Sequence, residues 1–390
     1  METKMDAIYF DHAATTPLDE RVLDAMLPWL KQEFGNANSM HQMGQRAKVA
    51  LEEARDSIAS LLHVEPSEVI FTSGGTESNN GSIRGVFEVA GDKNEIITSR
   101  IEHHAVLHTI ESLKRHGARP VYLEPDSEGR IYPDQVREVI SDRTALVSLM
   151  HVNNEIGSVN PLAEIAEICR ENSVPFHSDC VQSVGKIPVD VDELGLDLMS
   201  LSGHKLYGPK GVGVMIVRSS TPWIPTLTGG SQERRRRGGT SNIPGIVGLQ
   251  KAMELRIAEI DSHLTHVGEL RRRMLNQLEK AFGGQVQTNG PSDGGVPHIL
   301  NIGIKNDSNS VIDSEMLLLN LDIEDVCVSN GSACTSGAVE PSHVLTGIGL
   351  DDKVANASLR ISFGKDNTLE QVDAFIPKLK RVLDRMLAPA

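Results

Sequence analysis

Short apolar segments rich in β-branched residues alternate with helix-like segments up to about residue 217. The apolar segments are residues 69–72, 95–98, 145–150, 174–177, 196–201 and 212–217. Residues 18–29 and 49–62 instead carry apolar side chains at every third or fourth position, as amphipathic helices do. This alternation predicts an α/β fold with a mostly parallel sheet, covered by helices on both faces.

The pattern changes after about residue 250. Residues 257–282 and 369–387 form long, charged amphipathic segments, and residues 299–304 and 359–363 between them are strand-like. We therefore expect a large domain over residues 15–255. A smaller α+β domain is expected from residues 1–14 together with 256–390.

Charge and apolar patterning exclude several classes of partner. The formal net charge is −15, and the only dense basic cluster is residues 234–237, so a nucleic-acid footprint is not expected. No apolar run approaches the roughly 20 residues that span a bilayer, and the first residues lack the apolar core of a signal peptide. We expect a cytoplasmic protein without a membrane partner.

The four cysteines do not predict a disulfide framework or a structural zinc site. They are Cys169, Cys180, Cys327 and Cys334, and none forms a CxxC pair. Cys334 lies in the stretch SNGSACTSGAVEPSH, residues 329–343, which is too polar to bury a thiol as a core residue. Gly331 and Gly337 give this stretch backbone freedom, although an incidental surface thiol is the alternative.

Ligands of open α/β sheets bind at the carboxyl ends of the strands, so the residues that follow each predicted strand are the first candidates for a site. Residues 73–79 follow the first strand as a Gly-rich turn that opens a helix. The free N–H groups of such a turn suit a phosphate, and an ordinary helix cap is an equally good explanation.

Three histidines, His103, His104 and His108, follow the next strand. His104 and His108 are four residues apart and could share a helix face, but no acidic residue stands at the usual spacing of zinc ligands, so we expect no metal. His103 at the strand end could stack on a flat ligand and move protons near neutral pH.

The remaining strand ends carry polar groups. Asn154 follows one strand, and Asp179 and Gln182 follow the next; a buried carboxylate there could hold a protonated ring nitrogen. Lys205 lies between small-residue turns that suit an imine with a carbonyl cofactor. The glycines of 208–213 precede a strand, which argues against a dinucleotide fingerprint. Pyridoxal phosphate needs an anion-binding site, an amine that forms an imine and groups that control the electron density of its ring, and these segments together offer all three.

These motifs closely resemble those of NifS/IscS-type cysteine desulfurases, which are fold-type-I pyridoxal-phosphate enzymes of the class-V aminotransferase type. The resemblance runs from residues 11–17 to 359–364. Its most specific parts are residues 72–78, 102–103, 153–157, 202–205, 230–234, 237–240 and 331–337.

The resemblance implies a role for each matching residue. Lys205 would bind pyridoxal 5′-phosphate and act as the general acid and base. Asp179 would pair with the nitrogen of the cofactor ring, and Gln182 would reach its phenolic oxygen. His103 would stack on the ring and move the proton of the substrate thiol. The phosphate would be held by Gly75, Thr76, Ser202 and His204, with Thr240 from the second subunit of a homodimer. Asn154 and Arg360 would bind the substrate carboxylate, assisted by Asn36.

The activity implied is the conversion of L-cysteine to L-alanine. Cys334, on a mobile loop at about 326–342, would take the sulfur as a persulfide and deliver it to an acceptor protein, either an iron–sulfur scaffold or a tRNA-thiolation enzyme. The sequence leaves open a selenocysteine lyase or another class-V activity, a metal-dependent hydrolase and a non-catalytic sulfur carrier. It also leaves the role of Cys327 open.

Three positions depart from the family pattern. Residues 35–39 read GNANS where GNPSS is usual, which weakens the assignment of Asn36; Cys180 replaces a common Ala, and Ser241 replaces a usual Glu. Four consecutive arginines such as residues 234–237 ordinarily form a solvated patch or a patch that contacts nucleic acid. The family pattern instead places them at the dimer interface, near the cofactor phosphate.

Overall fold

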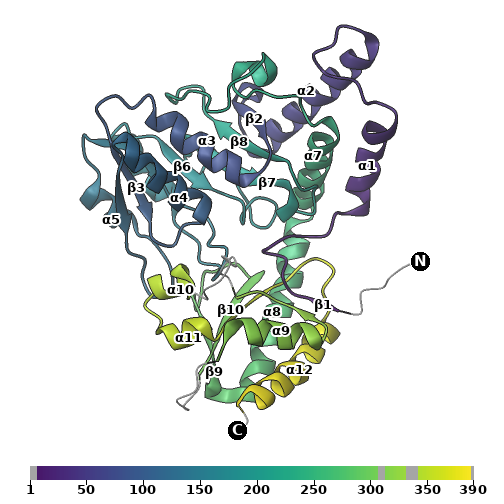
Figure 1. The fold of residues 1–390 in the computed structure, drawn as a ribbon, viewed down its shortest axis with the longest axis vertical. Coiled ribbons are helices and arrows are strands. Elements are labelled where there is room, and N and C mark those ends of the chain that lie inside the picture. The colour runs from purple at the N-terminus through teal and green to yellow at the C-terminus, as the bar shows by residue number, and fades with distance from the viewer. Residues whose placement is uncertain (1–6, 306–311, 331–340, 388–390) are drawn as a thin grey trace.

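The computed structural model describes residues 7–305, 312–330 and 341–387. Its centre is a seven-stranded sheet with the order β2-β8-β7-β6-β5-β3-β4 (Figure 1). Only β8 runs antiparallel to its two neighbours, so the mostly parallel sheet expected from the sequence is confirmed. The strands are β2 (Val69–Thr72), β3 (Glu95–Ser99), β4 (Arg119–Leu123), β5 (Thr144–Ser148), β6 (Phe176–Asp179), β7 (Leu198–Ser202) and β8 (Gly213–Val217).

Helices cover both faces of this sheet. Successive side chains of a strand point to opposite faces, and here both faces are apolar: Phe71 packs into one core and Ile70 into the other. The first core also takes side chains from α1 (Glu20–Lys31), α2 (Gln42–Leu62), α5 (Pro133–Val139), α6 (Leu162–Glu171) and α7 (Ile243–Ala258), and the second takes them from α3 (Gly75–Phe87) and α4 (His104–Leu113).

A second, smaller unit lies below the large sheet in Figure 1. Its antiparallel sheet has the order β12-β10-β9, and a two-stranded parallel sheet joins β1 to β11. Its elements are β1 (Ile8–Tyr9), α8 (Ile260–Phe282), β9 (Val286–Asn289), β10 (Ile299–Ile304), α9 (Ser314–Ile323), β11 (Val326–Cys327), α10 (His343–Gly347), α11 (Asp352–Asn356), β12 (Ser358–Ser362) and α12 (Leu369–Leu387).

The smaller unit has a core of its own. Phe10 meets the rings of Phe363 and Phe375 edge to face, with ring centroids 5.4 and 5.9 Å apart. This core joins side chains from the start of the chain to side chains after residue 266. The separate core supports the expected division into residues 15–255 and residues 1–14 with 256–390, whose boundaries remain a prediction.

Two strands differ from the sequence-based expectation, and a proline lies in or next to each. The expected strand at 174–177 begins only at Phe176, since Pro175 has no N–H to donate to a ladder. Strand β4 was not predicted from the sequence; it contains Pro120 and is an edge strand, where a missing donor is tolerated. No helix in the described ranges is both long and apolar enough to cross a membrane.

Candidate active site

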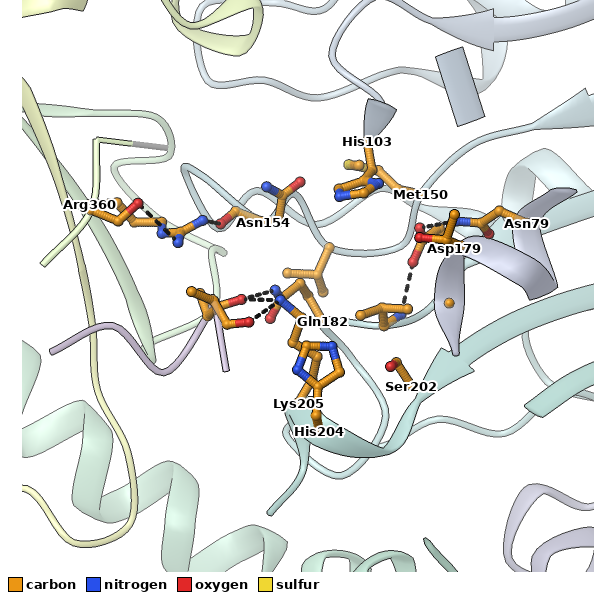
Figure 2. A pocket seen from close by; sticks show the side chains of 17 residues that line it. Asn79, His103, Met150, Asn154, Asp179, Gln182, Ser202, His204, Lys205 and Arg360 are labelled. Carbon is orange, nitrogen blue, oxygen red and sulfur yellow. Dashed lines mark hydrogen bonds between the residues drawn. The ribbon is translucent and has the colours of Figure 1, made fainter. Parts of the chain in front are cut away.

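A cavity of about 400 Å³ lies at the carboxyl ends of the sheet strands, where the two units meet (Figure 2). Most of its lining comes from the ends of the large-sheet strands and the segments that follow them, and the smaller unit contributes Ala13, Ala14, Ser329 and Arg360. The cavity brings together ten of the residues that the sequence singled out: Gly75, Thr76, His103, Asn154, Asp179, Gln182, Ser202, His204, Lys205 and Arg360.

The turn from β2 into α3 forms one wall. Gly74 has φ +147°, a backbone conformation that residues with a side chain rarely adopt, and a Cβ added at Gly75 would stand 2.7 Å from Cγ2 of Val181, so a side chain at either position would cause strain. The N–H groups of the first turn of α3 have no partner within the helix, and Thr76 and Ser202 add hydroxyl groups beside them. This wall is suited to a phosphate.

Asp179 ends β6, and two donors hold its carboxylate. Oδ1 accepts from the backbone N–H of Val181 at 3.0 Å, and Oδ2 accepts from Nδ2 of Asn79 at 2.6 Å (Figure 2). Asn79 lies on α3, one turn after Gly75, and the sequence analysis missed it. The sequence feature that could have indicated Asn79 is its spacing of four residues from Gly75, which places both on the same face of a helix.

Lys205 lies in the short turn that follows β7. Its Nζ donates to the carbonyl oxygens of Ala13 and Ala14 at 2.6 and 2.7 Å. Burial, followed by the nearby guanidinium of Arg360, lowers the pKa of this amine from 10.5 to about 8. A substantial fraction of Lys205 is therefore an uncharged nucleophile slightly above neutral pH.

His103 and His204 present uncharged rings to the cavity. His103 is the N-cap of α4, and its Nδ1 accepts from the backbone N–H of Ala105 at 3.0 Å. Burial lowers the pKa of both rings, that of His204 to about 4. Because Nδ1 of His103 is an acceptor, the neutral ring carries its hydrogen on Nε2 and is a donor there.

Arg360 reaches the cavity from β12 and is held in place on two sides. Nη1 donates to the carbonyl oxygen of Asn154 at 3.0 Å, and Nη2 donates to Oδ1 of Asp11 at 3.0 Å and to Oγ of Ser329 at 3.2 Å. Its buried Nε has no partner within the described residues. A planar guanidinium with a spare donor suits a carboxylate ligand.

The model of one protein family, aminotransferase class V, matches residues 8–375. The chain belongs to this family. A cysteine desulfurase IscS from Dictyoglomus turgidum is 44% identical over 97% of this chain and 95% of its own. A putative cysteine desulfurase IscS 1 from Bacillus subtilis is 44% identical over 98% of this chain and all of its own.

Solved structures show the same family relationship. A NifS-like protein superposes with a TM-score of 0.90 at 36% identity, covering 97% of this chain and 100% of its own. SspA in complex with cysteine superposes with a TM-score of 0.80 at 36% identity, covering 91% and 98%. The fold is thus that of the fold-type-I pyridoxal-phosphate enzymes, as the sequence predicted.

The cofactor of this class-V family member is pyridoxal 5′-phosphate, and the cavity fits it. The amine of Lys205, the carboxylate of Asp179 and the side-chain-free turn at Gly74 and Gly75 line one cavity. An aldehyde, a pyridine nitrogen and a phosphate need these three kinds of group.

Two assigned residues, Asn36 and Thr240, are not among the residues that line the cavity. Asn36 is exposed, and its Oδ1 accepts from the backbone N–H of Asn38. Thr240 is also exposed and lines a separate cavity of about 130 Å³ beside Arg237. Cys334 and the rest of residues 331–340 lie outside the described residues.

The arginine run of this class-V chain is bound within its own subunit. Arg234 pairs with Glu52, and Nε of Arg237 lies 2.8 Å from Oε1 of Glu77 on α3. These pairs place the run beside the phosphate turn. Whether it also faces a second subunit stays a prediction.

Two of the histidines that the sequence considered for a metal, His104 and His108, stack on one another. The rings of His104 and His108 lie 4.9 Å apart, and His343 lies 4.6 Å from His104. Among the described residues, no three His, Cys, Asp or Glu side chains are arranged to hold a metal ion.

Proposed function

We propose that this cysteine desulfurase transfers the sulfur of L-cysteine to Cys334. The thiol of Cys334 becomes a persulfide, and the substrate carbon skeleton takes up a proton and leaves as L-alanine, so that the atoms balance. The observation that carries the proposal is that Lys205, Asp179 and Arg360 line one cavity. That SspA was solved with cysteine supports the substrate.

Pyridoxal phosphate supplies an electron sink when it is bound. Lys205 would bind its carbonyl carbon through Nζ and would remove the Cα proton of the substrate with the same atom. Asp179, held by Asn79 and Val181, would keep the ring nitrogen protonated. The turn at Gly75 and Thr76, with Ser202 and His204, would bind the phosphate.

Arg360 and Asn154 would orient the substrate. The guanidinium already has one carboxylate neighbour, Asp11, so the substrate carboxylate would have to engage the remaining donors or displace Asp11. The bond from Arg360 to the carbonyl of Asn154 fixes the guanidinium plane. This arrangement supports recognition of an α-carboxylate at the mouth of the cavity.

The state of His103 refines the role that the family resemblance gives it. With Nδ1 accepting from Ala105, the Nε2–H would donate a hydrogen bond to the substrate sulfur and stabilise a thiolate there. Moving a thiol proton through this ring requires the bond to Ala105 to break. The ring is therefore proposed first as a donor to sulfur.

The acceptor, the dimer and the compartment belong to the same proposal. The sulfur would pass from Cys334 to an iron–sulfur scaffold or a tRNA-thiolation enzyme. Phe34 and Met40, 75% and 91% exposed near α1 and α2, support a homodimer in which a second copy covers them and lends Thr240. Cytoplasmic reducing conditions suit the free thiols of Cys169 and Cys180.

The test is to incubate the purified protein with L-cysteine, quantify L-alanine, and locate the persulfide by mass spectrometry. We expect alanine and a sulfur adduct on Cys334. Cys334→Ala should keep the cofactor colour and lose the persulfide, with Cys169→Ala as a matched control that keeps both. Alanine formation at an unchanged rate by Cys334→Ala would contradict the role of this thiol.

A further inference from the structure

A second lysine lies behind the cavity and has no role in the proposed reaction. Lys186 follows Gln182 by one turn after β6, and only 6% of its surface is exposed. Its Nζ donates to Oε1 of Gln182 at 2.5 Å. A buried lysine normally pairs with a carboxylate, and within the described residues no ion pair of Lys186 is found.

The surroundings of Lys186 are basic. A cavity of about 10 Å³, the size of one water, separates it from His12, Arg256, His263 and His298. Among the described residues, Nδ1 of His12 and both ring nitrogens of His298 have no partner. Burial, followed by the cations of Lys205 and Arg256, lowers the pKa of Lys186 well below its usual value.

The bond from Lys186 fixes which end of the Gln182 amide faces the cavity. The oxygen of the amide is occupied by Nζ of Lys186, while Nε2 donates one hydrogen to the carbonyl of Ala13 at 2.9 Å. The second hydrogen of Nε2 remains available, and Gln182 lines the cavity beside Lys205 (Figure 2). A flipped amide would place its oxygen against the carbonyl oxygen of Ala13, so that two acceptors face each other and the bond from Nε2 to Ala13 is lost.

We propose that Lys186 is a positioning residue that holds the Gln182 amide with its N–H toward the cofactor. This inference rests on the proposed assignment of Gln182 to the phenolic oxygen. An N–H donor there stabilises the deprotonated oxygen and lowers the pH at which the visible absorption of the bound cofactor titrates. Lys186 thus acts on the cofactor only through Gln182, without touching substrate.

The experiment is a double-mutant cycle on the cofactor-loaded protein. Lys186→Met, Gln182→Leu and the double variant are prepared, and the absorption of the bound cofactor is titrated with pH. Both single variants should titrate about half to one pH unit higher, the shift that one hydrogen bond can produce. The double variant should titrate with Gln182→Leu and show no further shift.

Each outcome has a distinct meaning. If Gln182→Leu shifts the titration and Lys186→Met does not, the positioning role is wrong while the assignment of Gln182 stands. If the two shifts add in the double variant, Lys186 acts independently of Gln182 and the proposal is also wrong. If Gln182→Leu itself has no effect, the assignment of Gln182 fails.

Folding is checked separately. Thermal unfolding of each variant without cofactor should remain cooperative, with Lys186→Met unfolding at a temperature a few degrees lower than the wild type, because the buried Oε1 of Gln182 loses its donor. Should Lys186→Met not fold, Lys186→Leu provides the same measurement with a smaller apolar side chain.

Discussion

Asn79 donates a hydrogen bond of 2.6 Å from Nδ2 to Oδ2 of Asp179. Both side chains are buried, and the bond joins α3 to the end of β6. The carboxylate expected to control the cofactor ring is therefore held by the same helix whose first turn forms the phosphate wall. In the proposed function, one helix would therefore position both the ring nitrogen and the phosphate of the cofactor.

Replacing Asn79 by alanine should weaken cofactor binding about tenfold, because a hydrogen bond to a charged group contributes roughly 1.5–3 kcal/mol. The measurement is titration of apoprotein with pyridoxal phosphate, followed by absorption. Asn172→Ala, whose amide bonds only to the backbone of its own helix, is the matched control. An unchanged dissociation constant for Asn79→Ala would show that Val181 alone holds Asp179.

The reactivity of Lys205 should follow its lowered pKa. Apoprotein should take up pyridoxal phosphate faster as the pH rises through about 8, where the amine loses its proton. Arg360→Leu removes a cation that lowers this pKa, so its profile should move to higher pH. Stopped-flow absorption at a series of pH values measures both. A profile that stays in place in Arg360→Leu would mean that burial alone sets the pKa of Lys205.

Arg360→Lys should impair cysteine binding more than turnover. Lysine keeps the charge but cannot keep the bonds to Asn154 and Asp11 while offering two parallel donors to a carboxylate. We expect KM for cysteine to rise about tenfold, as for a lost charged hydrogen bond, with a smaller change in kcat. Arg381→Lys, at an exposed pair with Glu324, is the control. Equal KM values for the two variants would remove Arg360 from substrate binding.

The candidate residues that lie at strand ends line one cavity, as their positions in the sequence predicted. Asp179, Gln182 and Lys205 follow parallel strands, so their meeting at one edge of the sheet follows from strand order alone. Helix and strand periodicity likewise placed α12 and β10 at their observed bounds. These features depend on local pattern, which a single sequence carries.

Contacts between distant segments could not be predicted. Asp11 meets Arg360 across 349 positions, and the carbonyls of Ala13 and Ala14 reach Lys205 from an N-terminal segment without helical or strand periodicity. Lys186 is also buried, and nothing in the sequence on either side of it indicates that its turn is buried. Such contacts depend on how the two units pack against each other. Local sequence patterns do not encode that packing.

Buried histidines should make the protein sensitive to acid. His177 lies inside the sheet, with Nδ1 and Nε2 hydrogen-bonded to the hydroxyls of Ser148 and Ser200 at 2.9 and 3.1 Å. Burial lowers its pKa from 6.5 to about 3, and burial lowers the pKa of His151 to about 4. Between pH 6.5 and these values the unfolded chain binds more protons, so stability is full above about pH 6.5 and falls as the pH is lowered.

Each such histidine should remove about 2 kcal/mol of unfolding free energy by pH 5, which is 1.5 pH units below the ordinary pKa. Denaturant unfolding of the cofactor-loaded protein at pH 7, 6 and 5 measures the slope. His177→Gln, with no ring to protonate, should flatten that slope even where it lowers stability at pH 7. The exposed His116→Gln should leave the slope unchanged. If His177 causes part of the acid sensitivity, removing its ring must flatten the dependence of stability on pH. A wild-type slope in His177→Gln would therefore mean that the acid sensitivity arises from other groups.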